Sequence, residues 1–382
     1  MSIGRLRTVP VILCVVSLGA IANADDTATK KSLHSEPMKT DMVGEAQDRE
    51  GYRLAFSFCH QSDWAPRTPQ EANKLERRLK QHPNDFDARE RLIDYYTRVA
   101  PKTQATHTAR VRHVLWIIQN QPASDFSRDA NLNLIPGAGI GEDDQQKAAR
   151  IWKKQVSAHP RNARIIWNAS NFFEVAELDY CIELLTQGQT LDPKDWRWPS
   201  KLASEYEYRM YQESGKQRHE TAEKALASFE RWYRVTSTVH ENNSILPMLG
   251  ESAFEAEEMD KARQYATKIL RLSAQYDPDK QAAAIYQGNW LLGRLAVKSG
   301  DLEKAKSYLL ASGRVSGSQG LKALGPNMRL AKELLEKGEQ QTVLDYFALC
   351  AEYWKNPKLK QWTEEVKAGK IPDFGFNLDN EL

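Results

Sequence analysis

The sequence predicts an all-α protein in which antiparallel helix pairs stack one on the next. A small residue recurs with a small or branched residue twelve positions later and a large apolar residue sixteen positions later, as at Gly293, Ala305 and Leu309. Histidine–proline and aspartate–proline pairs punctuate the chain between these segments. Because small residues let neighbouring helices pack at close range, the recurrence predicts repeated helix pairs.

Three further copies of this recurrence are present in the chain. They are Ala169, Cys181 and Leu185; Gly250, Ala262 and Ala266; and Ala331, Val343 and Phe347. With Ala203 as a fifth equivalent first position, the successive separations are 34, 47, 43 and 38 residues. We therefore expect helices or turns of unequal length within one architecture.

The first 24 residues have the order of a secretory signal peptide. Arg5 and Arg7 precede an apolar run over residues 9–21, and Ala22, Asn23 and Ala24 follow it. This order predicts export, with cleavage after Ala24, to the periplasm or the exterior of a bacterial cell envelope. No later apolar run reaches the length of a transmembrane helix, so we expect no stable membrane insertion after cleavage.

The predicted mature chain is electrically balanced. Cleavage removes two of the 53 basic residues and none of the 51 acidic ones, which leaves 51 of each. Nucleic-acid binding requires a clustered basic excess, so this balance argues against a nucleic-acid partner. About 358 residues remain, more than one globular core usually holds, which predicts two domains or an elongated array.

The chain divides into five predicted segments. Residues 1–24 are the signal peptide, and residues 25–67 are polar, without period, and interpreted as a disordered or irregular lead-in. Residues 68–158 form a helical region that starts at Thr68-Pro69 and has a helix over 111–120 and a loop over 121–141. Repeats follow over 159–356. Residues 357–382 supply a capping helix over 358–368 and a short tail.

Residues 290–311 resemble a tetratricopeptide repeat. Leu292-Gly293, Gly300-Asp301, Ala305 and Leu309 stand where that family places its packing residues, although Trp290 lies one place late. Residues 163–193 are similar and end in Leu-Asp-Pro. The resemblance is good over 160–355 and loose over 69–369, and the chain also resembles exported bacterial repeat proteins. It implies a right-handed superhelix whose concave surface binds a protein or peptide, without catalysis.

Motifs for catalysis, cofactors and metals are incomplete. His219-Glu220 and His240-Glu241 lack the second histidine of a zinc-protease helix, so we expect no metal site. The glycine-rich stretch 136–141 runs into three acids that would repel phosphate, which favours a linker. The acids Glu255, Glu257 and Glu258 are interpreted as solvated. We expect no catalytic residue, no cofactor and no enzymatic activity.

Three cysteines remain after the predicted cleavage. Cys181 and Cys350 fall at packing positions of helix pairs and are interpreted as small buried hydrophobes. Cys59 lies outside the repeats, and the sequence leaves open whether it is free or paired.

Two short segments are candidates for partner binding. Trp196 and Trp198 flank Arg197 in a turn before Pro199, where they form either an aromatic contact for a peptide or glycan, or a plug for the core between repeats. The loop over 312–320 is either a polar connection or a ligand-contacting edge. The candidate residues are Trp196, Arg197, Trp198, Arg314, Ser316 and Ser318.

Three functions are compatible with this sequence. A scaffold that binds a protein or peptide partner is the first. An envelope carbohydrate-binding protein, or a helical enzyme acting on a cell-wall glycan or peptide, is the second and would use the tryptophans of the turn. A structural spacer is the third.

Overall fold

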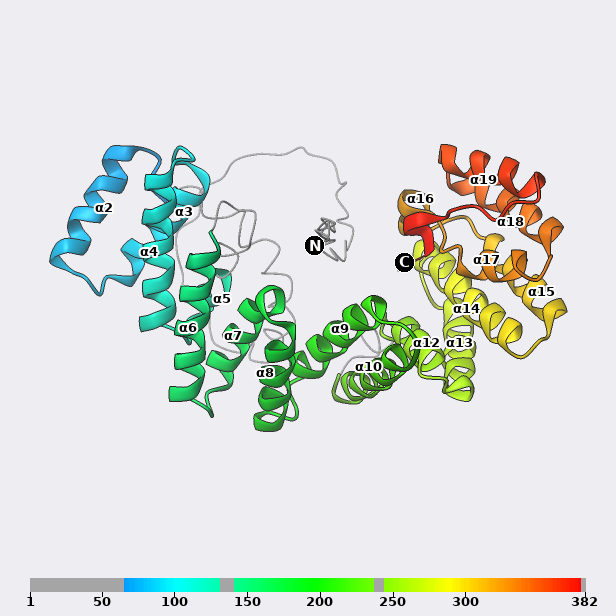
Figure 1. The fold of residues 1–382 in the computed structure, drawn as a ribbon, viewed down its shortest axis with the longest axis horizontal. Coiled ribbons are helices and arrows are strands. Elements are labelled where there is room, and N and C mark those ends of the chain that lie inside the picture. Colours follow the sequence, from blue (N-terminus) through cyan, green and yellow to red (C-terminus); the bar gives the residue numbers. More distant parts are fainter. Residues whose placement is uncertain (1–64, 131–140, 237–243, 379–382) are drawn as a thin grey trace, which may run out of the picture. The chain divides into compact units, whose positions relative to one another are not determined.

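The structure is a computed structural model that describes residues 65–130, 141–236 and 244–378. Over these residues the chain contains α-helices and one short 3-10 helix, with no strand, so the predicted all-α class is confirmed (Figure 1). The predicted signal peptide, most of the lead-in and Cys59 lie outside the described residues. None of the described helices is long and apolar enough to cross a membrane.

The helices follow one another with short connections. In the first part of the chain they are α2 (Pro69–Gln81), α3 (Phe86–Arg98), α4 (Gln104–Asn120), α5 (Asp125–Ala130), α6 (Glu142–Ala158), α7 (Ala163–Ala176) and α8 (Leu178–Leu191). In the second part they are α9 (Arg197–Gln212), α10 (Gly215–Val235), α12 (Leu246–Glu255), α13 (Met259–Ser273), α14 (Pro278–Lys298), α15 (Leu302–Gly313), α16 (Gln319–Leu324), α17 (Arg329–Leu335), α18 (Gln340–Tyr353), α19 (Pro357–Lys367) and the 3-10 helix η2 (Gly375–Leu378).

Side-chain caps fix where several helices begin. The hydroxyl of Thr68 accepts a hydrogen bond from the backbone N–H of Glu71, and Pro69 occupies the first turn, so α2 starts where the sequence predicts. Thr103 and Thr106 form a reciprocal capping box at the start of α4. This cap starts α4 at Gln104, before the predicted start at residue 111.

The predicted loop over 121–141 is wrong in part, because α5 forms within it. Ser124 accepts a hydrogen bond from the backbone N–H of Ser127, and the ring of Phe126 packs edge-on against Phe86 of α3 with centroids 6.3 Å apart. Asn168 of α7 donates hydrogen bonds to the carbonyls of Pro122 and Ser124. These contacts with distant residues stabilise a turn of helix that has no periodic signal of its own.

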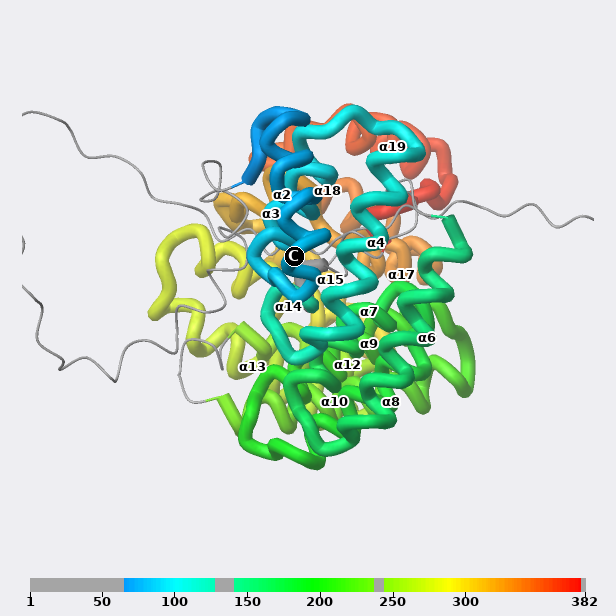
Figure 2. Tube along the Cα trace, turned by 90° about the vertical axis from the view of Figure 1, so that its left-hand side faces the viewer, coloured from blue at the N-terminus to red at the C-terminus, as the bar shows by residue number. Residues whose placement is uncertain are grey.

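The recurring small residues lie at close contacts between helices. A Cβ atom placed on Gly293 of α14 would lie 2.3 Å from a methyl carbon of Leu330 in α17 and 3.3 Å from the Cβ of Tyr308 in α15. One placed on Gly250 of α12 would lie 2.6 Å from a methyl carbon of Leu291 in α14. Helices consecutive in the chain, such as α12, α13, α14 and α15, pack against one another (Figure 2). The interpretation of the recurrence as a packing pattern is confirmed.

Buried side chains form three clusters. The first joins α2 to α3, the second runs from α3 to the start of α9, and the third runs from α9 to the C-terminal segment. Trp198 and Leu202 of α9 belong to the second cluster, whereas Ala203 belongs to the third. Tyr206 packs against both. Helix α9 is therefore the element that joins the two larger cores.

Cys181 and Cys350 are buried and free, as predicted for packing residues. Burial raises the pKa of both thiols above the ordinary value, which keeps them protonated and unreactive. The predicted capping helix is also present as α19, and its Trp362 is buried against Phe374 with ring centroids 5.0 Å apart.

Candidate functional site

The prediction of a turn at residues 196–198 is wrong for Arg197 and Trp198, which form the start of α9, while Trp196 is the residue just before it. The three residues have different environments. Trp198 is 2% exposed and packs edge-on against Trp167, with ring centroids 5.1 Å apart, as the plug interpretation expects. Trp196 is 45% exposed and stacks on Trp232 of α10. The guanidinium of Arg197 pairs with Asp195 at 2.7 Å. A glycan that stacks on both tryptophans is not supported, because only Trp196 presents a ring to solvent.

The other predicted residues lie between α15 and α16. Arg314 and Ser316 are exposed. Ser318 is buried, and its hydroxyl caps α16 by accepting a hydrogen bond from the backbone N–H of Leu321. Trp196 packs on α10 and Trp198 packs against α7 and against Gly188 of α8, whereas the hydroxyl of Ser318 bonds within its own segment at α16, so the two segments form separate groups. Their role in partner binding stays a prediction.

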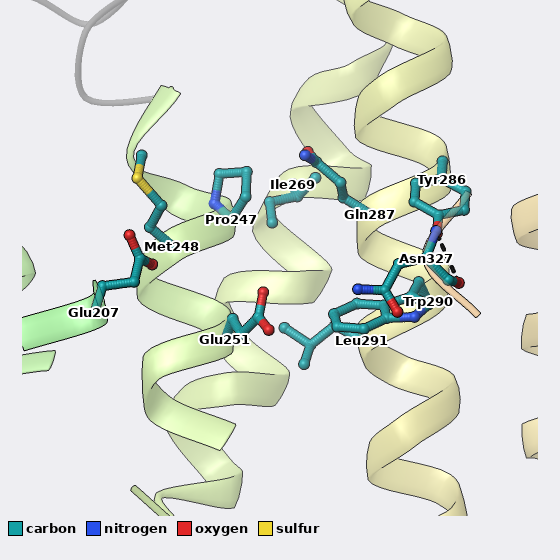
Figure 3. Close-up of a pocket in the computed structure, with 10 residues that line it drawn as sticks. All are labelled: Glu207, Pro247, Met248, Glu251, Ile269, Tyr286, Gln287, Trp290, Leu291 and Asn327. Carbon is teal, nitrogen blue, oxygen red and sulfur yellow. Dashed lines mark hydrogen bonds between the residues drawn. The ribbon is translucent and has the colours of Figure 1, made fainter. Parts of the chain in front are cut away.

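A small cavity lies where four helices meet, and its lining comes from α9, α12, α13, α14 and the residue Asn327 before α17 (Figure 3). Its volume is about 70 Å³. The lining residues are Glu207, Pro247, Met248, Glu251, Ile269, Tyr286, Gln287, Trp290, Leu291 and Asn327. Small-molecule sites usually measure roughly 300–1,000 Å³, so this cavity fits one side chain and not a cofactor.

The cavity wall is mostly apolar but carries two carboxylates and no cation. Glu251 of α12 and Trp290 of α14 extend toward each other across it (Figure 3). The hydroxyl of Tyr211 donates a hydrogen bond to Glu251 at 3.0 Å. The hydroxyl of Tyr286 accepts from the backbone N–H of Asn327 at 2.7 Å and donates to its carbonyl at 3.1 Å. These bonds hold the polar part of the wall in place.

Next to the cavity, three arginines from three helices surround Glu255, the last residue of α12. Arg218 of α10 donates a hydrogen bond to its carboxylate at 2.7 Å, and guanidinium nitrogens of Arg294 in α14 and Arg329 in α17 lie 3.4 and 3.5 Å from it. Arg294 also pairs with Glu333 of α17 at 3.0 Å. We call Arg218, Glu255, Arg294, Arg329 and Glu333 the arginine cluster.

The interpretation of Glu255 as a solvated acid is therefore wrong. Its side chain is 12% exposed, and burial alone would raise the pKa of its carboxyl. The hydrogen bond from Arg218 and the charges of Arg294, Arg218 and Arg329 outweigh burial and hold the pKa below the ordinary value. Glu255 is ionised, and it joins α10, α12, α14 and α17.

Aromatic rings connect the arginine cluster to the cavity. The guanidinium of Arg294 lies 4.2 Å from the ring centre of Phe254 and 5.1 Å from that of Trp290, which lines the cavity. Arg218 and Arg329 lie over the ring of Tyr211, the residue that holds Glu251. The cluster thus contacts the aromatic residues that form or hold the cavity wall.

Sequence reasoning missed these residues because each is unremarkable in its own segment. One available signal was the position of Arg294, which directly follows the close-packed Gly293 and so is placed near a helix interface. The other members come from α10, α12 and α17, and only the packing of these helices brings them together.

Comparisons with known proteins add no family to these observations. No protein-family model matches the chain, and no curated protein matches it. Within the described residues, no group of three or more histidine, cysteine, aspartate or glutamate side chains is arranged to hold a metal ion.

Proposed function

We propose that the chain is an exported helical-repeat scaffold that binds a peptide segment of a partner protein. The observation that carries this proposal is the cavity formed by α9, α12, α13 and α14, whose volume suits one inserted side chain. The proposal includes the tetratricopeptide-like superhelix, with the cavity on its concave surface, and delivery to the cell envelope.

The lining of the cavity favours a particular kind of peptide. Met248, Ile269 and Leu291 offer an apolar surface, which stabilises an inserted apolar side chain by its removal from water. Glu207 and Glu251 give the wall negative charge without a lining cation. We therefore propose an apolar anchor residue next to a lysine or arginine in the partner.

The arginine cluster supports this function by holding the receptor in one conformation. It ties α10, α12, α14 and α17 through charge-assisted contacts to Glu255 and Glu333. A receptor that is already ordered loses little conformational entropy on binding, so more of the contact energy contributes to affinity.

Selection of binders from a random peptide library, displayed against the mature chain, tests the proposal. We expect the selected peptides to share an apolar residue beside a lysine or arginine. Met248→Trp fills the cavity, and we expect it to weaken the binding of a selected peptide at least tenfold by isothermal titration.

Leu324→Trp is the matched control, because Leu324 is an exposed residue of α16 that does not line the cavity. It adds the same aromatic side chain and should leave affinity unchanged. Circular dichroism melts verify that both variants fold. Equal binding of a selected peptide by the wild type and Met248→Trp would exclude the cavity as the binding site.

A further inference from the structure

A second surface feature, a groove of about 730 Å³, lies between α4 and α6. It is lined by two stripes with the same helical spacing, one on each helix. The stripe on α4 is Arg112, Leu115, Trp116, Gln119 and Asn120, and the stripe on α6 is Lys147, Arg150, Ile151, Lys154 and Gln155. Residues at these spacings share one face of a helix, so both helices turn one face to the groove.

Contacts at both ends set the register of the two helices. His107 of α4 lies 3.3 Å from the carboxylate of Asp144 in α6, and the side-chain amide of Gln155 donates to the carbonyl of Gln119 at 2.6 Å. The partners are 37 and 36 residues apart in the chain, so α4 and α6 run parallel. The groove is a fixed feature between two registered helices.

The groove has four cations and no carboxylate in its lining. Arg112 is paired with Glu76 of α2 at 2.8 Å, and Lys147 with Asp144 at 3.0 Å. Arg150 and Lys154 are exposed, and among the described residues no carboxylate lies within 4.0 Å of either. These two side chains lie one helical turn apart and carry positive charge that the described chain does not neutralise.

Apolar side chains from both helices also line the groove. Leu115, Trp116 and Ile151 line the groove and are half-buried. The guanidinium of Arg89 lies 4.0 Å from the ring centre of Trp116, which fixes the position of the indole. The groove therefore combines an apolar surface with positive charge along α6.

We propose that the α4–α6 groove binds an acidic peptide segment that carries an apolar residue between its carboxylates. Each face spans nine residues of helix, roughly 12 Å, the length of about three to four extended residues. Carboxylates two positions apart on an extended segment lie on one side of it, about 7 Å apart, and the apolar residue between them lies on the opposite side, toward Leu115 and Trp116 of α4. This spacing is close to the roughly 6 Å between Arg150 and Lys154, one turn apart on α6.

The charge of the whole chain favours a peptide over a nucleic acid. The chain carries 53 basic and 51 acidic side chains, and the groove has four cations over two helical turns. Nucleic-acid binding depends on many phosphate contacts along a longer basic surface.

Fluorescence anisotropy with the mature full-length chain tests this site. The probe is a fluorescein-labelled peptide that repeats Asp-Leu-Glu four times, and the comparison peptide repeats Asn-Leu-Gln. We expect the acidic probe alone to bind, with an affinity that falls as salt is added. The double variant R150Q/K154Q should weaken binding about tenfold, because both unneutralised cations are lost.

The control variant K216Q/K224Q removes two exposed cations from α10 and keeps the same net charge as the test variant. It should bind the acidic probe like the wild type, and thermal melts establish that both variants are folded. The proposal is overturned if R150Q/K154Q binds as tightly as the wild type. It is also overturned if the neutral peptide binds equally well, or if oligothymidine of equal charge displaces the probe as effectively as unlabelled acidic peptide.

The groove and the cavity are tested separately. Met248→Trp blocks the cavity of α9, α12, α13 and α14 and should leave binding of the acidic probe unchanged. R150Q/K154Q should likewise leave the binding of library-selected peptides unchanged. Failure of either site in its own assay therefore leaves the other result interpretable.

Discussion

The first helices of the chain and the later ones each gather several donors around one carboxylate, but at different depths. Glu76 of α2 accepts a hydrogen bond from Tyr96 of α3 at 2.9 Å, pairs with Arg112 of α4 and lies 3.0 Å from His113. Its side chain is 24% exposed, against 12% for Glu255. In both regions one carboxylate with several donors joins neighbouring helices; Glu76 does so near the surface, and Glu255 does so at a more buried position.

This difference relates to where each region keeps its positive charge. Both regions bury arginines, but with different partners: Arg89 in the first bonds the carbonyl of Pro83 and the ring of His113, whereas Arg294 in the second pairs with Glu255 and Glu333. The first region also leaves Arg150 and Lys154 in an open groove. A buried guanidinium requires polar partners, whereas exposed cations remain available to a binding partner. The comparison is consistent with a structural role for the arginine cluster and with the proposal that the α4–α6 groove binds an acidic peptide.

The largest expected effect comes from removal of the more buried carboxylate. Glu255→Ala leaves three arginines without their shared acid, and we expect the free energy of unfolding to fall by about 3–5 kcal/mol. Glu76→Ala should cost about 1–3 kcal/mol, because its partners are closer to water. Urea denaturation followed by circular dichroism measures both values. Equal losses in the two variants would remove the distinction between the two regions.

The second effect concerns α9, which joins the two larger cores. Glu205 is buried beside Lys201, whose ammonium lies 3.6 Å away and also bonds Glu174 of α7. Burial raises the pKa of Glu205 from 4.5 to about 7; the positive charge of Lys201 opposes this shift, and the negative charge of Glu174 adds to it. Between pH 4.5 and about 7, the carboxyl of Glu205 is therefore protonated in the folded state and ionised in the unfolded state.

Stability should therefore fall as the pH rises from 4.5 to about 7. Glu205→Gln keeps the shape without the titration, so we expect it to be more stable than the wild type at pH 8, by roughly 3 kcal/mol at most. The two proteins should have similar stability at pH 4.5. Denaturation series at both pH values measure this difference. A difference that does not change with pH would contradict the assignment to Glu205.

The smallest effect tests the close packing of the second region. Gly293→Ala places a methyl group 2.3 Å from a carbon of Leu330, and the resulting repacking should cost about 1–3 kcal/mol. Gly141→Ala, at the N-cap of α6, meets no atom within 4 Å, so its cost is limited to the weaker cap, about 0.5–1 kcal/mol. Thermal melts compare the two. A neutral Gly293→Ala would show that α14 and α17 separate at little cost.

Local signals in the sequence predicted much of the helical architecture. Thr68 and Pro69 start α2 as predicted, and the recurrence around Gly293 marks real contacts between helices. The prediction was wrong for α5, since Asn168 and Phe86 stabilise that helix from outside its own segment. Local sequence patterns predict helices that neighbouring residues stabilise. They do not predict a helix, such as α5, that depends on contacts with distant residues.

The candidate sites were less accessible to sequence reasoning. Trp196 and Trp198 were predicted to lie in a turn between helices, whereas Trp198 belongs to the first turn of α9 and is part of the core. The arginine cluster and the cavity carry no motif, because their members are spaced tens of residues apart on separate helices.

The all-α class, several helix starts and the burial of Cys181 and Cys350 follow from the sequence alone, because caps, prolines and small residues act within a few turns of chain. The burial of Glu255 among arginines and the basic groove between α4 and α6 follow only from the packing of the helices. Charge and burial depend on which helices meet, and the residues that meet are 36 positions apart for Gln119 and Gln155, 37 for Arg218 and Glu255, and 39 for Arg294 and Glu255.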